Sequence, residues 1–421
     1  MDADIDVPPF FLCPISLEIM KDPVTVSSGI TYDRESIEKW LFSGKKETCP
    51  VTKQVLSSDW DLTPNHTLRR LIQAWCTMNA SLGIERIPTP RPPISKSQIA
   101  KLIRGAKSPQ SQSKCLRQLR SIAAESETNK RCLESAGAVE FLAAVISNDG
   151  DDDDNENSLS SSSSDDESFD FARSRSDEAL SILHNLHLSE TVLKGLIGKN
   201  GEFVESLTRV MRQGSYDSRA YSVMLLKSMF DVADPMEMIS LRTELFTELV
   251  QILRDQVSPQ ATKAALKLLI QLCPWGRNRV KAVEAGAVAV LIELLLDSVE
   301  RRTCEMILMG LDQMCGCAEG RAELMGHAAG LGVVSKRVLR VSHIGSEKAV
   351  RILLSIAKFS ATPAVLAEML QLGVVAKLCL VLQVDCGGKT KEKAREILRL
   401  HARTWRNSSC VPMHLLAYYP N

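Results

Sequence analysis

The sequence has few aromatic residues, no net charge and no long apolar run, and each lack excludes a class of protein. Aromatic residues make up 5% of the 421 residues, too few for a platform that stacks single-stranded nucleic acid. The 51 Lys and Arg equal the 51 Asp and Glu, which argues against a coat for nucleic acid or anionic membrane. The longest apolar run, 285–296, includes Glu293 and is shorter than the roughly 18 residues that a membrane span needs.

Export signals and paired cysteines are also missing. Three of the first six residues are aspartates, and the segment lacks the apolar stretch of a secretory signal. The 12 cysteines are scattered along the chain. We therefore expect free thiols in a reducing compartment, the cytoplasm or the nucleus. We expect neither a membrane span nor a nucleic-acid partner.

Two changes of composition divide the chain. Four prolines between Pro88 and Pro93 predict an extended linker, placed at 83–96, between a small domain at 8–82 and a long region at 97–406. An acidic and serine-rich insert at about 149–172 is too polar to bury a core, so we expect it to be disordered. It is either a solvated loop or a phosphorylated serine tract. Residues 407–421 are read as a C-terminal tail.

The long region repeats a glycine followed by apolar residues. The glycines are 41 residues apart between Gly332 and Gly373, and 46 apart between Gly286 and Gly332, while Gly137 and Gly201 fit the same register. A helical period of about 40–47 residues is typical of armadillo or HEAT repeats, which stack into a solenoid. An unrelated helical bundle is the alternative. The fold class is therefore predominantly α, with a small α+β domain at the N-terminus.

The N-terminal domain reads as a hairpin and two helices. Residues 24–26 and 30–32 alternate like strands around the turn 27–29. Asp33 is placed to cap a helix that runs through Leu41. Asn65 is placed to cap a second helix, one face of which carries Leu68, Leu71, Ile72 and Trp75.

Two Cys-Pro loops lack the second cysteine of a zinc site. Cys13 is followed by Ser16, and Cys49 by Thr52, where C-x-x-C would place ligands. No histidine occurs before His66, so four zinc ligands cannot be assembled and we predict no metal and no cofactor. Hydrogen bonds and charge pairs must hold the loops instead, and the candidates are Asp22, Asp33, Arg34 and Asp61. Cys13 and Cys49 are expected to act as small buried apolar groups.

These motifs together resemble a U-box, the zinc-free relative of the RING domain of ubiquitin ligases. The resemblance rests on Cys13 to Val24, Gly29 to Arg34, Cys49 to Thr52 and Thr63 to Asn65. A U-box followed by armadillo repeats is similar to the plant U-box ligases, including a subclass implicated in stress and immune signalling. The resemblance implies a ubiquitin transferase without a nucleophile of its own. Such a ligase holds a ubiquitin-charged conjugating enzyme near a substrate lysine, so that proximity accelerates the transfer.

The resemblance also assigns the partner surface, to the apolar residues Ile15, Leu17, Trp40 and Pro50. Lys53 matches a cationic position that holds ubiquitin against its carrier, where arginine is frequent in the family. Core packing is the alternative for the three larger apolar residues, and simple solvation is the alternative for Lys53. Cys13, Asp22, Asp33, Arg34, Cys49 and Asn65 are expected to be structural.

The third helix of each repeat is expected to line a concave groove that holds a protein substrate. We place these helices near 177–189, 217–231, 259–273, 300–315, 346–359 and 391–405. The importin branch has a row of asparagines, called a ladder, along this groove. Here only Asn185 resembles such a ladder residue, because the comparable positions in the other repeats are Ser228, Gln271, Gln313 and Lys358. Nuclear-signal binding is therefore not expected. A non-catalytic armadillo scaffold with a docking or dimerising U-box is the rival hypothesis, and homo-oligomers stay open.

Overall fold

The computed structural model describes residues 7–43, 46–56, 62–88, 94–148, 165–186, 188–198, 201–405 and 419. The chain packs as two compact units, one of residues 1–142 and 185–187 and one of residues 143–184 and 188–421. The U-box-like region therefore shares a unit with the first helices that follow the linker. Asp61 and nearly all of the predicted tail lie outside the described residues.

The N-terminal region folds around a small antiparallel sheet in the order β2-β1-β3. β1 (Pro23–Thr25) pairs with β2 (Thr31–Asp33) so that Val24 faces Tyr32, which confirms the predicted hairpin within one residue. β3 (Thr63–Pro64) pairs with the other edge of β1. The helical elements are η1 (Pro9–Phe11), α1 (Arg34–Glu38), η2 (Lys39–Ser43), α2 (His66–Met78) and η3 (Ala80–Leu82).

Two predictions for these helices need correction. Asp33 stands at the start of α1, but its carboxylate does not cap the helix, because it accepts the backbone N–H groups of Lys21 and Asp22 at 2.8 and 2.9 Å. The helix passes at Lys39 into the wider π-helical turn η2. Asn65 caps α2 as predicted, since its side chain accepts the N–H of Leu68. On the predicted apolar face of α2, Ile72 is buried whereas Leu71 is 53% exposed.

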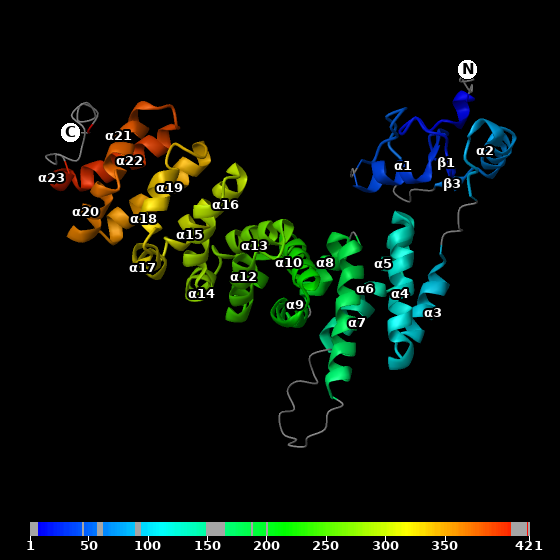
Figure 1. Ribbon diagram of the computed structural model, residues 1–421, viewed down its shortest axis with the longest axis horizontal. Helices are drawn as coiled ribbons and strands as arrows, with labels where there is room; N and C mark the ends of the chain where they lie inside the picture. The colour runs from blue at the N-terminus through cyan, green and yellow to red at the C-terminus, as the bar shows by residue number, and fades with distance from the viewer. Residues whose placement is uncertain are drawn as a thin grey trace. The chain divides into compact units, whose positions relative to one another are not determined.

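The repeat region is a series of helices that follow one another in chain order (Figure 1). Its helices up to residue 142 belong to the first unit, and nearly all of the rest belong to the second. The first helices are α3 (Lys96–Gly105), α4 (Pro109–Glu125), α5 (Glu127–Ser135), α6 (Ala138–Asn148) and α7 (Asp165–Asn185). Four triplets of helices follow. They are α8 (Glu190–Ile197), α9 (Glu202–Gln213) and α10 (Tyr216–Asp231); α11 (Pro235–Ile239), α12 (Thr243–Asp255) and α13 (Pro259–Leu272); α14 (Asn278–Glu284), α15 (Ala287–Asp297) and α16 (Arg301–Met314); and α17 (Ala318–Gly326), α18 (Gly330–Arg337) and α19 (His343–Phe359). The last are α20 (Pro363–Gln371), α21 (Val374–Gln383), α22 (Gly388–Leu400) and α23 (Ala402–Trp405).

The recurring glycine marks the turn before each second helix. Gly137, Gly201, Gly286 and Gly373 all adopt left-handed φ values of 70–84°, a conformation that costs other residues about 1–2 kcal/mol. Gly332 was wrongly assigned to this position, because it lies inside α18, where Ala329 begins the helix with a negative φ. The armadillo architecture therefore depends on a turn that four of the five predicted glycines provide.

The insert and the third helices add two details. The predicted disorder at about 149–172 extends too far, since α7 already begins at Asp165. Among the groove positions named from the sequence, Lys358 pairs with Glu396 of α22. Gln271 and Ser355 donate to the carbonyls of Phe230 and Cys315, at the C-terminal ends of the preceding third helices.

No single helix in the described part of the chain has the length and apolar composition of a membrane span, although the bent pair α20 and α21 passes that test jointly.

Candidate partner surface of the U-box

The two Cys-Pro loops have the same internal hydrogen bonds. In the first loop, the N–H of Cys13 donates to the carbonyl of Glu18, and the N–H of Leu17 donates back to Cys13. In the second, Cys49 N–H donates to Gln54 and Lys53 N–H donates back to Cys49. All four distances lie between 2.8 and 2.9 Å. Backbone hydrogen bonds therefore close both loops in the same way.

Each loop holds one residue in a strained conformation. Leu17 and Lys53 have φ values of 59° and 61°, in the left-handed region that disfavours residues with a Cβ. They occupy equivalent positions, and both were singled out from the sequence for the partner surface. Such strain persists where the surrounding structure imposes it, and it is concentrated at functional sites. The Leu17 side chain is 74% exposed.

The cysteine sulfurs anchor the loops as hydrogen-bond acceptors, which corrects their prediction as merely apolar groups. Both residues are fully buried. Cys13 Sγ accepts the N–H of Asp33 at 3.3 Å. Cys49 Sγ accepts the Ser28 hydroxyl at 3.1 Å and lies 3.0 Å from the Tyr32 hydroxyl, which itself accepts the N–H of Val51. The Tyr32 proton is therefore directed at the sulfur.

These donors set the acidity of the cysteine. Burial raises the pKa of the Cys49 thiol, but the hydrogen bonds from Ser28, Thr52 and Tyr32 together outweigh it and bring the pKa to about 6. Burial and the bond to Cys49 raise the pKa of Tyr32. The hydroxyls thus stabilise the thiolate form of Cys49. In the described residues no group of three or more His, Cys, Asp or Glu side chains could hold a metal ion.

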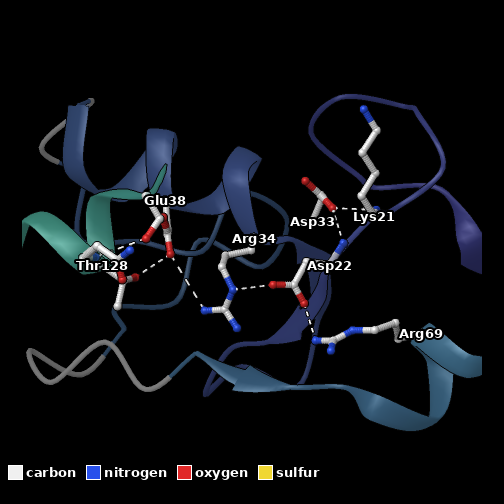
Figure 2. Close-up of polar contacts among 9 residues, drawn as sticks. Lys21, Asp22, Asp33, Arg34, Glu38, Arg69 and Thr128 are labelled. Atoms are coloured by element: carbon white, nitrogen blue, oxygen red, sulfur yellow. Dashed lines mark hydrogen bonds and ion pairs between the residues drawn. The ribbon is translucent and has the colours of Figure 1, made fainter. Parts of the chain in front are cut away.

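A network of charges connects the sheet to both helices, as Figure 2 shows. Asp22 accepts a bond from Arg34 Nε at 2.7 Å and pairs with Arg69 of α2. Arg34 also reaches Glu38, at 3.8 Å. All of these side chains are largely buried, where hydrogen-bonded charge pairs are stronger than on the surface. The network confirms Asp22 and Arg34 as structural, whereas Glu38 and Arg69 were missed by the sequence analysis.

The network continues into the repeat region. The Thr128 hydroxyl at the start of α5 donates to Glu38 Oε1 at 2.5 Å, and the backbone N–H groups of Glu127 and Thr128 also bond to this carboxylate (Figure 2). An anion at a helix N-terminus is stabilised by the unpaired N–H groups there. Glu38 is 3% exposed, and burial raises the pKa of its carboxyl despite these bonds and Arg34.

Trp40 is packed against the core on one side and partly exposed on the other. Its Nε1 donates to the carbonyl of Thr48 at 2.9 Å. Lys46 Nζ lies 3.7 Å from the centroid of its ring, and Lys53 Nζ lies 5.8 Å away. Both are cation–π distances. Lys53 is therefore not simply solvated, and Lys46 is an additional cation that the sequence analysis missed.

The remaining predicted residues lie around the same core. Ile15 packs partly buried against it, and Pro50 is half-buried. Val51 and Val55 in the second loop, 53% and 76% exposed, were not predicted and extend the apolar surface. The two valines lie four positions apart with only polar residues between them, so no apolar period in the sequence marked them. We use "partner surface" for Ile15, Leu17, Trp40, Pro50 and Lys53.

Comparison with known families agrees with both parts of this architecture. Residues 7–81 match the U-box domain, and residues 98–420 match the plant U-box protein ARM repeat region. A solved structure from a study of a phosphorylation switch in the cadherin and β-catenin interaction superposes with a TM-score of 0.59 at 13% identity. It covers 85% of this chain and 62% of that one, which supports the armadillo fold alone.

Relatives of known class extend over the full chain. The Arabidopsis thaliana E3 ubiquitin-protein ligases PUB22 and PUB23 are 60% and 59% identical, covering 100% of this chain and 100% and 98% of their own lengths. The Arabidopsis thaliana E3 ubiquitin-protein ligase PUB24 is 37% identical over 99% of this chain and 96% of its own. These matches confirm the enzyme class predicted from the sequence, a ubiquitin transferase. The chain belongs to the plant U-box ubiquitin ligases, whose U-box is followed by an armadillo repeat region.

Proposed function

We propose that the partner surface binds a ubiquitin-charged conjugating enzyme while the armadillo repeats hold a protein substrate. The observation that carries this proposal is the strained and 74% exposed Leu17 beside the half-buried Ile15. An exposed apolar side chain in a rigid loop is a good anchor for a partner, since little freedom is lost on binding.

The chemistry is an acyl transfer between two bound partners. A substrate lysine amine attacks the thioester carbonyl, an isopeptide bond forms, and the conjugating enzyme's cysteine leaves as a thiol. This chain supplies no nucleophile, so its contribution is proximity and orientation. Lys53, held above Trp40, is suited to an acceptor on the ubiquitin surface. Lysine provides one point charge rather than the planar fork of arginine, which makes this contact less directional.

The site of action follows from the family alone. We propose the cytoplasm, with the nucleus as the alternative, and stress or immune signalling as the process. The relatives' assignment as E3 ligases favours this activity over a non-catalytic scaffold.

The test is autoubiquitination in a reconstituted reaction with a panel of conjugating enzymes. Ile15→Ala and Leu17→Ala should each reduce the rate at least tenfold, which is about 1.4 kcal/mol of lost anchoring. Met78→Ala is the matched control, because Met78 is 75% exposed on α2, outside the partner surface. Unchanged rates in folded Ile15 and Leu17 variants would refute the assigned surface. Inactivity of the wild type with every enzyme would favour the scaffold.

A further inference from the structure

The third helices of the repeats carry an excess of positive charge that the rest of the chain balances. α10, α13, α16, α19 and α22 contain 14 Lys and Arg but only 7 Asp and Glu. By contrast, the second helices contain 6 Lys and Arg and 7 Asp and Glu; these helices are α9, α12, α15, α18 and α21. Because the whole chain is neutral, the excess belongs to one layer of the solenoid. We use "third-helix face" for the solvent-exposed side chains of those five helices.

Most of the acidic residues toward the C-terminal end of this face are occupied by pairs between neighbouring helices. Asp312 of α16 pairs with Lys348 and Arg351 of α19, at 3.6 and 3.1 Å. Lys393 and Glu396 of α22 make two more pairs with α19, Lys393 to Glu347 at 3.1 Å and Glu396 to Lys358 at 2.5 Å. These acids therefore hold adjacent helices together, and the cations in excess remain for a partner.

The helix α13 presents the clearest unmatched charge. It contains no acidic residue, and its exposed stripe carries Lys263 and Lys267 one turn apart, while most of its other side chains are buried. Neither lysine forms an ion pair with any residue in the described part of the chain. Arg302, exposed at the start of the neighbouring α16, adds a third cation. Two like charges one turn apart repel each other, so an anionic partner would relieve that cost.

Apolar side chains interleave with these cations. Tyr221 and Met224 of α10 are partly exposed on one side of α13, and Met306 and Met309 of α16 are partly exposed on the other. Methionine adapts its shape to irregular apolar partners. Thioether side chains offer little to a phosphate backbone, which binds through charge and base stacking. The mixture favours a peptide that has both acidic and apolar residues.

We propose that the third-helix face around α13 binds a substrate segment in which Asp or Glu alternates with apolar side chains. This inference rests on the proposed function, in which the repeats hold the substrate. The carboxylates pair with Lys263, Lys267 and Arg302, and the apolar side chains pack on the methionines of α10 and α16.

The experiment measures binding of a labelled peptide of alternating Glu and Leu residues to the full chain by fluorescence anisotropy. The variant combines Lys263→Gln, Lys267→Gln and Arg302→Gln, all exposed positions. We expect binding about tenfold weaker, consistent with three exposed charge pairs of about 0.5 kcal/mol each. Higher salt should weaken peptide binding by the wild type more than peptide binding by the variant.

The matched control removes three exposed cations elsewhere in the repeats, with Lys194→Gln, Arg277→Gln and Lys336→Gln. Equal loss of affinity in the control would overturn the assigned face, and so would tighter binding of a Lys-Leu peptide or of duplex DNA by the wild type. Autoubiquitination of the same proteins separates the two proposals. It depends on the U-box and should be equal in all three, so a wild type that binds the peptide but builds no chains would refute the ligase proposal alone.

Discussion

The contact between Glu38 and the start of α5 makes the sharpest prediction, because one buried carboxylate joins the U-box to the first repeat helices. Glu38→Ala leaves the Thr128 hydroxyl, two backbone N–H groups and part of Arg34 without their partner. Removing one partner of a buried charge network costs about 3–5 kcal/mol. We expect about 3 kcal/mol of lost unfolding free energy, since Thr128 is only partly buried and water can replace some of the lost bonds.

A double-mutant cycle isolates the contact. Thr128→Val removes one hydroxyl and should cost about 1 kcal/mol, while the two changes together should cost at least 1 kcal/mol less than their sum. Urea unfolding followed by circular dichroism provides the three free energies. Strictly additive costs would refute the reasoning, because they would mean that Glu38 and Thr128 do not interact in solution.

The pH dependence tests the same group independently. The pKa of the Glu38 carboxyl is raised, by burial first, so the folded state holds its proton to higher pH than the unfolded chain. Its contribution to stability is then complete below the ordinary carboxyl value and is lost as pH rises through the raised pKa. Glu38→Gln mimics the protonated form. Its free energy of unfolding should equal that of the wild type at low pH and exceed it increasingly as pH rises. A difference that stays constant with pH would contradict this assignment.

Three other predictions concern the U-box. Arg34→Lys should lower the free energy of unfolding in urea by about 1–2 kcal/mol, because an ammonium group cannot replace the guanidinium that joins Asp22 to Glu38. A loss of less than about 0.3 kcal/mol would argue against the network. Leu17→Gly should raise the free energy of unfolding by about 1 kcal/mol, because glycine adopts the left-handed φ without strain. The same change should lower the ubiquitination rate. A variant as active as the wild type would show that the Leu17 side chain is dispensable. The pKa of the Cys49 thiol is about 6, below that of a thiol in the unfolded chain. The stability of the wild type relative to Cys49→Ala should therefore increase as pH rises from about 6 toward the ordinary thiol pKa, and this gain should be lost as pH falls through 6. Thermal unfolding across this range measures it, and the absence of such a trend would mean that the sulfur stays protonated.

Much of the architecture could be predicted because its signals are local in the chain. Asn65 caps its helix with its own side chain, and the glycines that precede α9, α15 and α21 occupy turns that require a left-handed residue. The Cys-Pro loops identified the U-box because their spacing is short and regular. In each case the residue type and its immediate neighbours carry the physical reason.

The errors occur where a distant part of the chain decides. Asp33 has the composition of a helix cap, but the backbone of Lys21 and Asp22 is folded against it and takes both bonds. Leu71 fits the apolar period of α2, yet its side chain is 53% exposed while that of Ile72 is buried. The side chain of Lys358 pairs with Glu396 of α22, a partner 38 positions away that no local pattern indicates.

The sequence by itself determined the two kinds of fold and the two Cys-Pro loops. Only the tertiary structure decided how these residues are held: the left-handed backbone at Leu17 and Lys53, the lysines above Trp40, and the carboxylate of Glu38 at the N-terminus of α5. Helix and turn preferences act over a few residues, whereas a buried charge is placed by partners up to 90 positions away. No local pattern encodes those partners.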